Sequence, residues 1–304
     1  AVCNNIGDAI RFRYTLLPYL YTLFFMAHTQ GLPIWRPRVF EFPSELESYQ
    51  MLDSDESVMV GGSILAIPAL HQGQKMTTTT LPASAEFVDF WVGKGLSAGS
   101  RATFDIPSVH AKSARQMVVP LLLRSGSVIP LLDKNSTAAA QSTERLGNEG
   151  VELVVTLNST CSASGNLYHD DGETTEFAVS GAFCERVVAV SMQEAGAQGV
   201  QMSVTINPTN RNSSFCSEDS WKRRSIENSI RFGHVTTITI YFALCPRFTS
   251  ETKGARIASA DGSVWNSEKT SLFSVWSFAR NDPFTKSESS PSLQLRIDVP
   301  LQIK

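Results

Sequence analysis

The chain has 304 residues, which is enough for two or three domains of ordinary size. Hydrophobic residues make up 42% and charged residues 18% of it, a balance typical of globular proteins. The net charge of -3 is too small to indicate binding to nucleic acid or to a charged membrane surface. Short runs of Val, Ile, Leu and Thr, broken by Gly, Ser, Asn and Pro, favour a mainly β body.

The first predicted element is a helix within RYTLLPYLYTLFFMAH, residues 13–28, where apolar residues recur at helical spacing. Its apolar run of about 14 residues is shorter than the roughly 20 that a membrane span needs. Pro18 either kinks the helix or marks the first turn of a second helix, and Gly31 is the expected C-cap. Since most of its surface is apolar, the helix should pack into a much larger body, with His28 as a hydrogen-bonded core residue.

Extended segments follow this helix. The alternation in residues 32–43 predicts a strand that Pro37 interrupts by a bulge. Arg36 and Arg38 could line a sugar site, but an ion pair with Glu41 or Asp55 is the preferred interpretation. The apolar run at 58–70 predicts a buried strand interrupted by Gly61–Gly62.

Two later segments carry polar residues between apolar runs. In one, Gly126 is expected to allow a tight bend and Arg124 to anchor a carboxylate or a backbone carbonyl. In the other, HDDGE at 169–173, the three carboxylates and the imidazole, Asp170 among them, could serve acid–base catalysis or bind calcium. A structural turn is preferred, because Asp171–Gly172 is a strong hairpin dipeptide and its flanks look like strands.

The second half of the chain is predicted to be rich in strands. A polar linker is expected at 133–150, and strand patterns recur at 151–158, 185–193, 200–207, 236–244 and 293–303. The Ser-rich stretches 208–230 and 247–290 are long for loops, so we expect them to be insertions or partly disordered.

The cysteines and sequons concern the cellular compartment. Five scattered cysteines are too few to predict a disulfide scaffold, and without a C-x-x-C pair a structural zinc site is not expected. Glycosylation sequons at Asn135, Asn158 and Asn212 lean towards the secretory pathway, meaning the ER, a lysosome or vacuole, or the exterior. The chain starts with Ala1 and shows no signal peptide, which we interpret as a processed chain or a fragment.

Five motifs, in order, resemble those of the α-glucosidases of glycoside hydrolase family 31. Residues 13–45 are similar to the last barrel helix and strand of the family. The other four motifs lie at 55–70, 81–94, 118–131 and 165–177. They keep Pro68, Trp91, Arg124 and Gly172 in place, whereas Ser57 stands where Gln is usual. The resemblance covers about residues 8–190.

This resemblance implies a (β/α)8 catalytic barrel followed by two β-sandwich domains. The chain would hold the C-terminal end of the barrel at 1–56, a proximal sandwich at 57–148, and a distal sandwich with Ser-rich insertions at 149–304. Members of the family hydrolyse terminal α-linked glucose with retention, using two carboxylates. The family's motifs for these carboxylates are not found in this sequence.

The resemblance therefore implies no catalytic, substrate-binding or metal-binding residue and no cofactor in this chain, which alone should be inactive. Its partners would be the upstream catalytic portion and, through that portion, an oligosaccharide or glycan. Arg36, Pro37, Arg124, Gly126, Asp170, Asp171 and Gly172 would be structural residues of the family's motifs.

Two alternatives stay open. The chain could be a non-catalytic module that binds carbohydrate through aromatic residues such as Trp91, although a core cluster of Trp91 with Phe87 and Phe90 is preferred. It could also be a purely structural relative. The apolar helix speaks against this last interpretation, since soluble monomers rarely expose such a surface.

Overall fold

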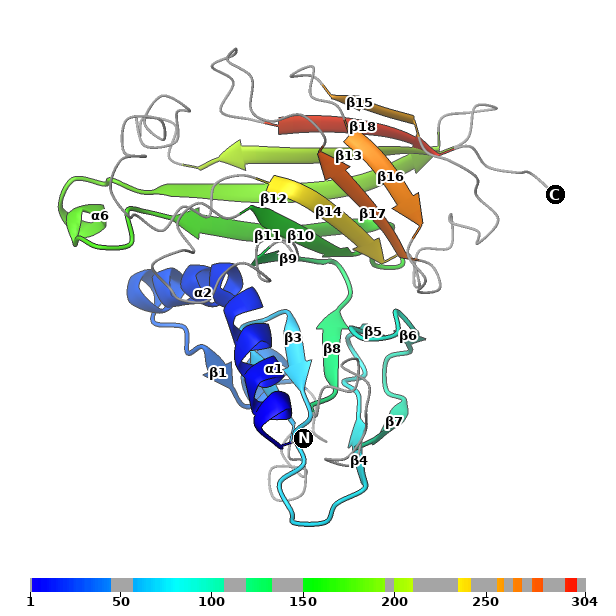
Figure 1. Cartoon of the computed structure of the whole chain (residues 1–304). Helices are drawn as coiled ribbons and strands as arrows, with labels where there is room; N and C mark the ends of the chain where they lie inside the picture. The colour runs from blue at the N-terminus through cyan, green and yellow to red at the C-terminus, as the bar shows by residue number, and fades with distance from the viewer. Residues whose placement is uncertain are drawn as a thin grey trace.

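The computed structural model describes residues 2–44, 57–106, 119–132, 150–194, 200–209 and 235–241, and the strands at 256–259, 265–269, 275–280 and 293–299. Two helices precede two large β-sheets and a small two-stranded sheet (Figure 1). The mainly β architecture expected from composition is confirmed. None of the helices in the described ranges is long and apolar enough to cross a membrane.

The N-terminal segment forms two consecutive helices, α1 at Val2–Thr15 and α2 at Leu17–Gln30. Pro18 lies in the first turn of α2, where its missing amide hydrogen leaves no helical bond unmade. Gly31 ends α2 in the left-handed conformation, and its N–H donates to the carbonyl of Ala27 at 3.0 Å. Of the two roles foreseen for Pro18, the start of a second helix is confirmed, as is the Gly31 cap.

The prediction of a core position for His28 is wrong. The buried residues of α2 are Pro18, Tyr19, Thr22 and Leu23, all in its first half, and Phe25 and Met26 beyond them are partly buried. His28 is exposed in the last turn, where its ring meets the edge of another ring, that of Phe177.

The first large sheet follows the helices and has the strand order β1-β2-β3-β8-β5-β6. Its strands are β1 (Trp35–Arg36), β2 (Val58–Val60), β3 (Ile64–Ala66), β5 (Phe87–Asp89), β6 (Gly95–Leu96) and β8 (Leu121–Arg124). β4 (Met76–Thr80) and β7 (Arg101–Asp105) form the two-stranded sheet. The short β1 lies at one edge of the first sheet.

The long strand predicted at 32–43 is not present. Only Trp35 and Arg36 are extended, and the short helix α3 follows at Arg38–Glu41. Pro37 separates the two elements, because it has no N–H for a strand ladder and is tolerated at a helix start.

The segment at 58–70 is a hairpin rather than a single strand. β2 and β3 pair as antiparallel neighbours, with Val60 opposite Ile64. Gly61 turns the chain with φ 60°, and a Cβ atom there would overlap the Tyr19 hydroxyl. Only glycine fits both the turn and the approach of α2.

The second large sheet has ten strands in the order β15-β18-β13-β12-β11-β9-β10-β14-β17-β16. Its first six strands along the chain are β9 (Ser127–Leu132), β10 (Val151–Thr156), β11 (Ser162–His169), β12 (Cys184–Glu194), β13 (Val200–Pro208) and β14 (Val235–Tyr241). The last four are β15 (Arg256–Ser259), β16 (Trp265–Lys269), β17 (Val275–Arg280) and β18 (Leu293–Val299). A strand is thus confirmed within each of the five segments predicted at 151–158, 185–193, 200–207, 236–244 and 293–303, of which residues 242–244 and 300–303 lie outside the described ranges.

The segment 247–290, expected to be an insertion, contributes three paired strands to this sheet: β15, β16 and β17. Its pattern is hard to recognise because the strands are short and carry Ser, Asn and charged residues among the apolar ones.

The chain passes from the first sheet to the second between β8 and β9, through Ser125 and Gly126 alone. Gly126 has φ 78°, which suits a tight bend. The domain boundary expected at 148–149 falls in residues outside the described ranges. The change of sheet itself lies some twenty residues earlier, at Ser125–Gly126.

The main core lies in the ten-stranded sheet and draws on both of its halves. Fully buried residues from β9, β10 and β14 share one cluster with residues from β11, β12 and β13. Tyr14, Leu17 and Tyr21 of the helices pack against the same cluster, and in Figure 1 α2 lies beneath the second sheet while α1 runs alongside the first. Cys161 and Cys184 are fully buried and disulfide-bonded.

Candidate functional site

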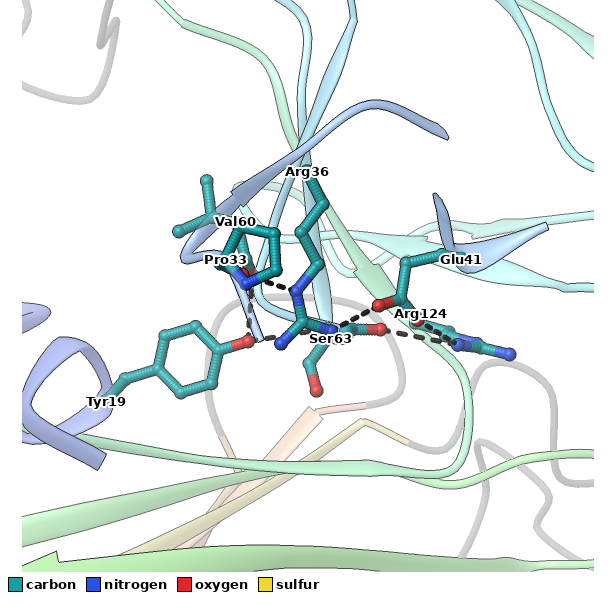
Figure 2. Close-up of polar contacts among 8 residues, drawn as sticks. Tyr19, Pro33, Arg36, Glu41, Val60, Ser63 and Arg124 are labelled. Atoms are coloured by element: carbon teal, nitrogen blue, oxygen red, sulfur yellow. Dashed lines mark hydrogen bonds and ion pairs between the residues drawn. The ribbon is translucent and has the colours of Figure 1, made fainter. Parts of the chain in front are cut away.

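The first polar cluster of interest surrounds Glu41, at the end of α3. Arg36 pairs with one oxygen of Glu41, and its Nε donates to the carbonyl of Pro33 at 2.6 Å (Figure 2). Arg124 approaches the other oxygen of Glu41 at 3.4 Å. The side chains of Arg36 and Glu41 are only 6% and 14% exposed, so a buried carboxylate is held between two guanidinium groups.

Arg124 ties this cluster to the first sheet. Its Nη1 also lies 3.5 Å from the carbonyl of Gly62, in the β2–β3 turn, and its guanidinium stacks over the ring of Phe42. A carboxylate and a backbone carbonyl are the two kinds of anchor foreseen for this arginine. Arg38 is buried, and its Nη1 lies 3.4 Å from the hydroxyl of Thr79.

Tyr19 connects α2 to the same turn. Its hydroxyl donates to the carbonyl of Val60 at 2.8 Å and accepts from the N–H of Ser63 at 3.3 Å (Figure 2). Burial raises the pKa of Tyr19 to about 12, and the hydrogen bond with Ser63 lowers it in part. Tyr19 is therefore a neutral structural hydroxyl at physiological pH.

The second polar cluster surrounds Asp170 and links α2 to the second sheet. The hydroxyls of Tyr21 and Tyr168 donate to the two oxygens of Asp170, at 2.5 and 2.6 Å, and the N–H of Gly172 donates at 2.8 Å. Burial, followed by the hydrogen bond to Asp170, raises the pKa of both tyrosines well above the usual value. The Tyr168 N–H also donates to the hydroxyl of Thr22.

The hairpin predicted at Asp171–Gly172 differs from the structure. β11 and β12 do pair, but fourteen residues, 170–183, separate His169 from Cys184. The expected second strand at TTEFAV is instead the short helix α6, Glu176–Val179. Asp171 favours this helical path, because its carboxylate accepts bonds from the backbone of Glu173 and Thr174.

The aromatic residues considered for sugar stacking lie in packed positions. Phe87 is fully buried, whereas Phe90 and Trp91 are partly buried and contact Phe12 of α1. Asp89 caps this turn by accepting from the N–H groups of Trp91 and Val92. Phe90 and Trp91 pack together as expected, but Phe87 belongs to a different core cluster, so the predicted cluster of all three is found only in part.

Of the three sequons, only Asn158 lies within the described ranges; Asn135 and Asn212 lie outside them. Asn158 is partly buried in the turn between β10 and β11. Its Oδ1 accepts bonds from the backbone and hydroxyl of Thr160 and from the N–H of Ser162. The side chain thus organises the turn.

The chemistry available to these clusters is limited by their partners. Glu41 is neutralised by two arginines, and Asp170 is enclosed by two phenols and an amide, so each carboxylate already has a structural role. Within the described ranges, no group of three His, Cys, Asp or Glu side chains could hold a metal ion. The Glu41 cluster joins α3 to the β2–β3 turn of the first sheet, and the Asp170 cluster joins α2 to the second sheet.

The Asp170 cluster could not be recognised in the sequence, because Tyr21 and Asp170 are 149 residues apart. One general signal was available: a tyrosine on a buried helix face needs a partner for its hydroxyl. The contact of Arg36 with Glu41 was easier to anticipate, since only five residues separate them.

Comparisons with known proteins agree with this architecture. Residues 31–129 match the glycosyl hydrolase family 31 C-terminal domain. A probable glucan 1,3-alpha-glucosidase of Oryza sativa is 34% identical over 59% of this chain, and one of Arabidopsis thaliana is 35% identical over 56%. The chain spans only 18% and 17% of the length of these relatives.

The structural comparison extends further along the chain. The structure of the ER glucosidase II heterodimeric complex matches 97% of this chain with a TM-score of 0.67, while this chain covers 28% of that one. At 22% identity, this likeness shows a shared fold. Together, the match of residues 31–129 to the family 31 C-terminal domain and the similarity to these relatives are consistent with a C-terminal part of a family 31 α-glucosidase.

Proposed function

We propose that this chain is the C-terminal portion of a retaining α-glucosidase that hydrolyses terminal α-linked glucose from oligosaccharides or glycans. The match of residues 31–129 to the family model carries the proposal, and the names of the relatives indicate the substrate class. Retaining hydrolysis needs two carboxylates about 5 Å apart. We place that pair on the portion of the polypeptide that precedes this chain.

The role of this stretch would be architectural. In this proposal α1, α2 and β1 complete the end of a catalytic barrel, and two β-sandwich domains support its rim. The support comes from apolar side chains that the described structure leaves exposed on these elements, Ile6, Ile10, Phe24 and Trp35, and from Phe40 on the following α3. β1 also lies at the edge of the first sheet, where a further strand could pair. Soluble monomers rarely expose so much apolar surface, so we assign it to contact with the preceding portion.

We also propose a location in the secretory pathway. Two observations support it. The sequence holds three sequons, at Asn135, Asn158 and Asn212. In addition, Cys161 and Cys184 are disulfide-bonded, and structural disulfides persist mainly in oxidising compartments.

The test begins with peptide mapping by mass spectrometry of the native protein from its source. Peptides upstream of Ala1, on the same polypeptide or on a bound partner chain, are expected. The purified protein should release glucose from an aryl α-glucoside with retained configuration, as followed by NMR, whereas residues 1–304 expressed alone should not. Hydrolysis by residues 1–304 alone, or a native protein without a preceding catalytic portion, would refute the proposal.

A further inference from the structure

Cys161 and Cys184, the disulfide-bonded cysteines within the described ranges, lie at opposite ends of one pair of strands. Cys161 directly precedes β11, and Cys184 is the first residue of β12. In the antiparallel register, Ser162 lies opposite Ser191 and His169 lies opposite Cys184. Cys161 therefore lies at the end of β11 that is remote from Cys184.

This separation is too large for a bond between the two. Cys184 faces His169, eight positions along β11 from Cys161, which corresponds to about 26 Å at the usual rise of a strand. The Cα atoms of a disulfide lie within about 7 Å of each other. The surroundings also differ, because Cys161 belongs to the main core of the second sheet and Cys184 to a separate small cluster with Ala182.

We infer that Cys161 and Cys184 belong to two separate disulfides, whose partners are two of the three other cysteines, Cys3, Cys216 and Cys245. One of the five cysteines then lies outside both bridges. Each bridge forms when two thiols give two electrons and two protons to a disulfide oxidant, such as oxidised glutathione, which is reduced to two thiols. The inference does not depend on the proposed glucosidase function.

The backbone at Cys161 is consistent with a side chain retained for bonding. Cys161 has φ 57°, a left-handed conformation that glycine adopts more readily. Its N–H donates to the carbonyl of Asn158, and its own carbonyl accepts from the N–H of Met192. A structural disulfide at Cys161 would offset the cost of placing a cysteine in a conformation that favours glycine.

The bridges would fasten both ends of the β11–β12 pair. This pair forms the middle of the second sheet, and β11 also carries Tyr168, which contacts Asp170 and α2. Two bridges, each to a different segment, would hold the strands against the rest of the sheet more firmly than one.

The experiment is disulfide mapping of the full-length protein, exported through an oxidising compartment and alkylated before digestion without reductant. We expect the Cys161 peptide linked to one of the three candidate peptides and the Cys184 peptide linked to another. A Cys161–Cys184 link, a link from either to a cysteine upstream of Ala1, or alkylation of either before reduction would overturn the inference.

Single substitutions give an independent readout. Cys161→Ser and Cys184→Ser should each expose one additional thiol to iodoacetamide, at a different cysteine in the two variants. If Cys161→Ser made Cys184 reactive, the two residues would share a bridge and the inference would be wrong. The mapping of the unmodified protein decides the question even where a variant fails to fold.

Discussion

Tyr21 of α2 donates a hydrogen bond of 2.5 Å to Asp170, 149 residues further along the chain. Tyr168 donates to the other oxygen of the same carboxylate, and its ring stacks on Phe25 of α2 at 4.0 Å. One carboxylate therefore joins the first helical segment to the second sheet. Because hydrogen bonds to a charged acceptor are stronger than neutral ones, this contact should contribute strongly to stability.

Asp170→Asn should lower the free energy of unfolding by about 3 kcal/mol, because the amide replaces a charged acceptor of two phenol hydroxyls. Urea unfolding followed by fluorescence measures the loss. Asp171→Asn is the matched control, since its Oδ1 can still accept from Glu173 and Thr174, and should cost under about 1 kcal/mol. Equal losses in the two variants would contradict the assigned role of Asp170.

Glu41→Gln should destabilise the protein by about 3 kcal/mol, because the largely buried Arg36 loses its charged partner. Thermal unfolding at pH 7 measures the change. Asp8→Asn removes the exposed ion pair with Arg11 and should change stability by under about 0.5 kcal/mol. A Glu41→Gln variant as stable as the Asp8→Asn control would show that the buried pair adds little.

Stability should fall between pH 10 and about 12, since the pKa of Tyr19 is raised to about 12 in the folded state. The unfolded chain loses this proton near its ordinary pKa of about 10, so the contribution of Tyr19 is complete below that pH and is lost as the pH rises through the folded value. Tyr21 and Tyr168 act in the same direction.

Tyr19→Phe should be less stable than the parent at pH 8, because the bond to Val60 is lost, yet less sensitive to pH between 10 and 12. Urea unfolding at several pH values, with absorbance near 295 nm to follow phenolate formation, provides both readouts. An unchanged slope in the variant would mean that Tyr19 does not titrate as described.

Gly61→Ala should cost about 3 kcal/mol, since the new methyl group would overlap the Tyr19 hydroxyl and meet Leu23 at 2.6 Å. Gly73→Ala provides the control: its φ is 78°, also positive, but nothing lies within 4 Å of the added atom. This control should lose about 1 kcal/mol from backbone strain alone. Similar losses in both variants would remove the argument that Gly61 permits the approach of α2.

Residues 1–304 alone should self-associate and bind an apolar dye, because Phe24 and Trp35 are 60% and 62% exposed. Light scattering after gel filtration measures association. Ile10→Glu on α1 should reduce both signals, whereas Val179→Glu on α6, an equally apolar residue that is 80% exposed elsewhere, should change them little. A stable monomer with low dye binding would count against the docking role of α1 and α2.

Sequence reasoning succeeded where one local pattern determines one element. The cap at Gly31 and the apolar run of β10 are examples, since helix ends and buried strands leave local signals. It failed where a single residue ends or redirects an element. Pro37 ends β1 early, and the bonds of Asp171 direct the chain towards α6 instead of a tight hairpin.

The polar clusters were predictable only in part. Arg36 and Glu41 are close in sequence, so their pairing could be anticipated. The hydrogen bond between Tyr21 and Asp170 depends on how α2 packs on β11. The spacing of apolar residues in the sequence does not predict that packing. The strands β15, β16 and β17 were not predicted, because they are short and mix polar with apolar residues.

The passage through Ser125 and Gly126 has a mechanical consequence. Arg124 contacts Glu41, while its own carbonyl accepts from the hydroxyl of Thr156 in β10, and the N–H of Gly126 donates to the carbonyl of Thr156. With only two residues between β8 and β9, the connection is too short to act as a hinge between the two sheets. A displacement of the second sheet should therefore pass through Arg124 to Glu41 and β1, so we expect the two sheets to move together as one rigid unit.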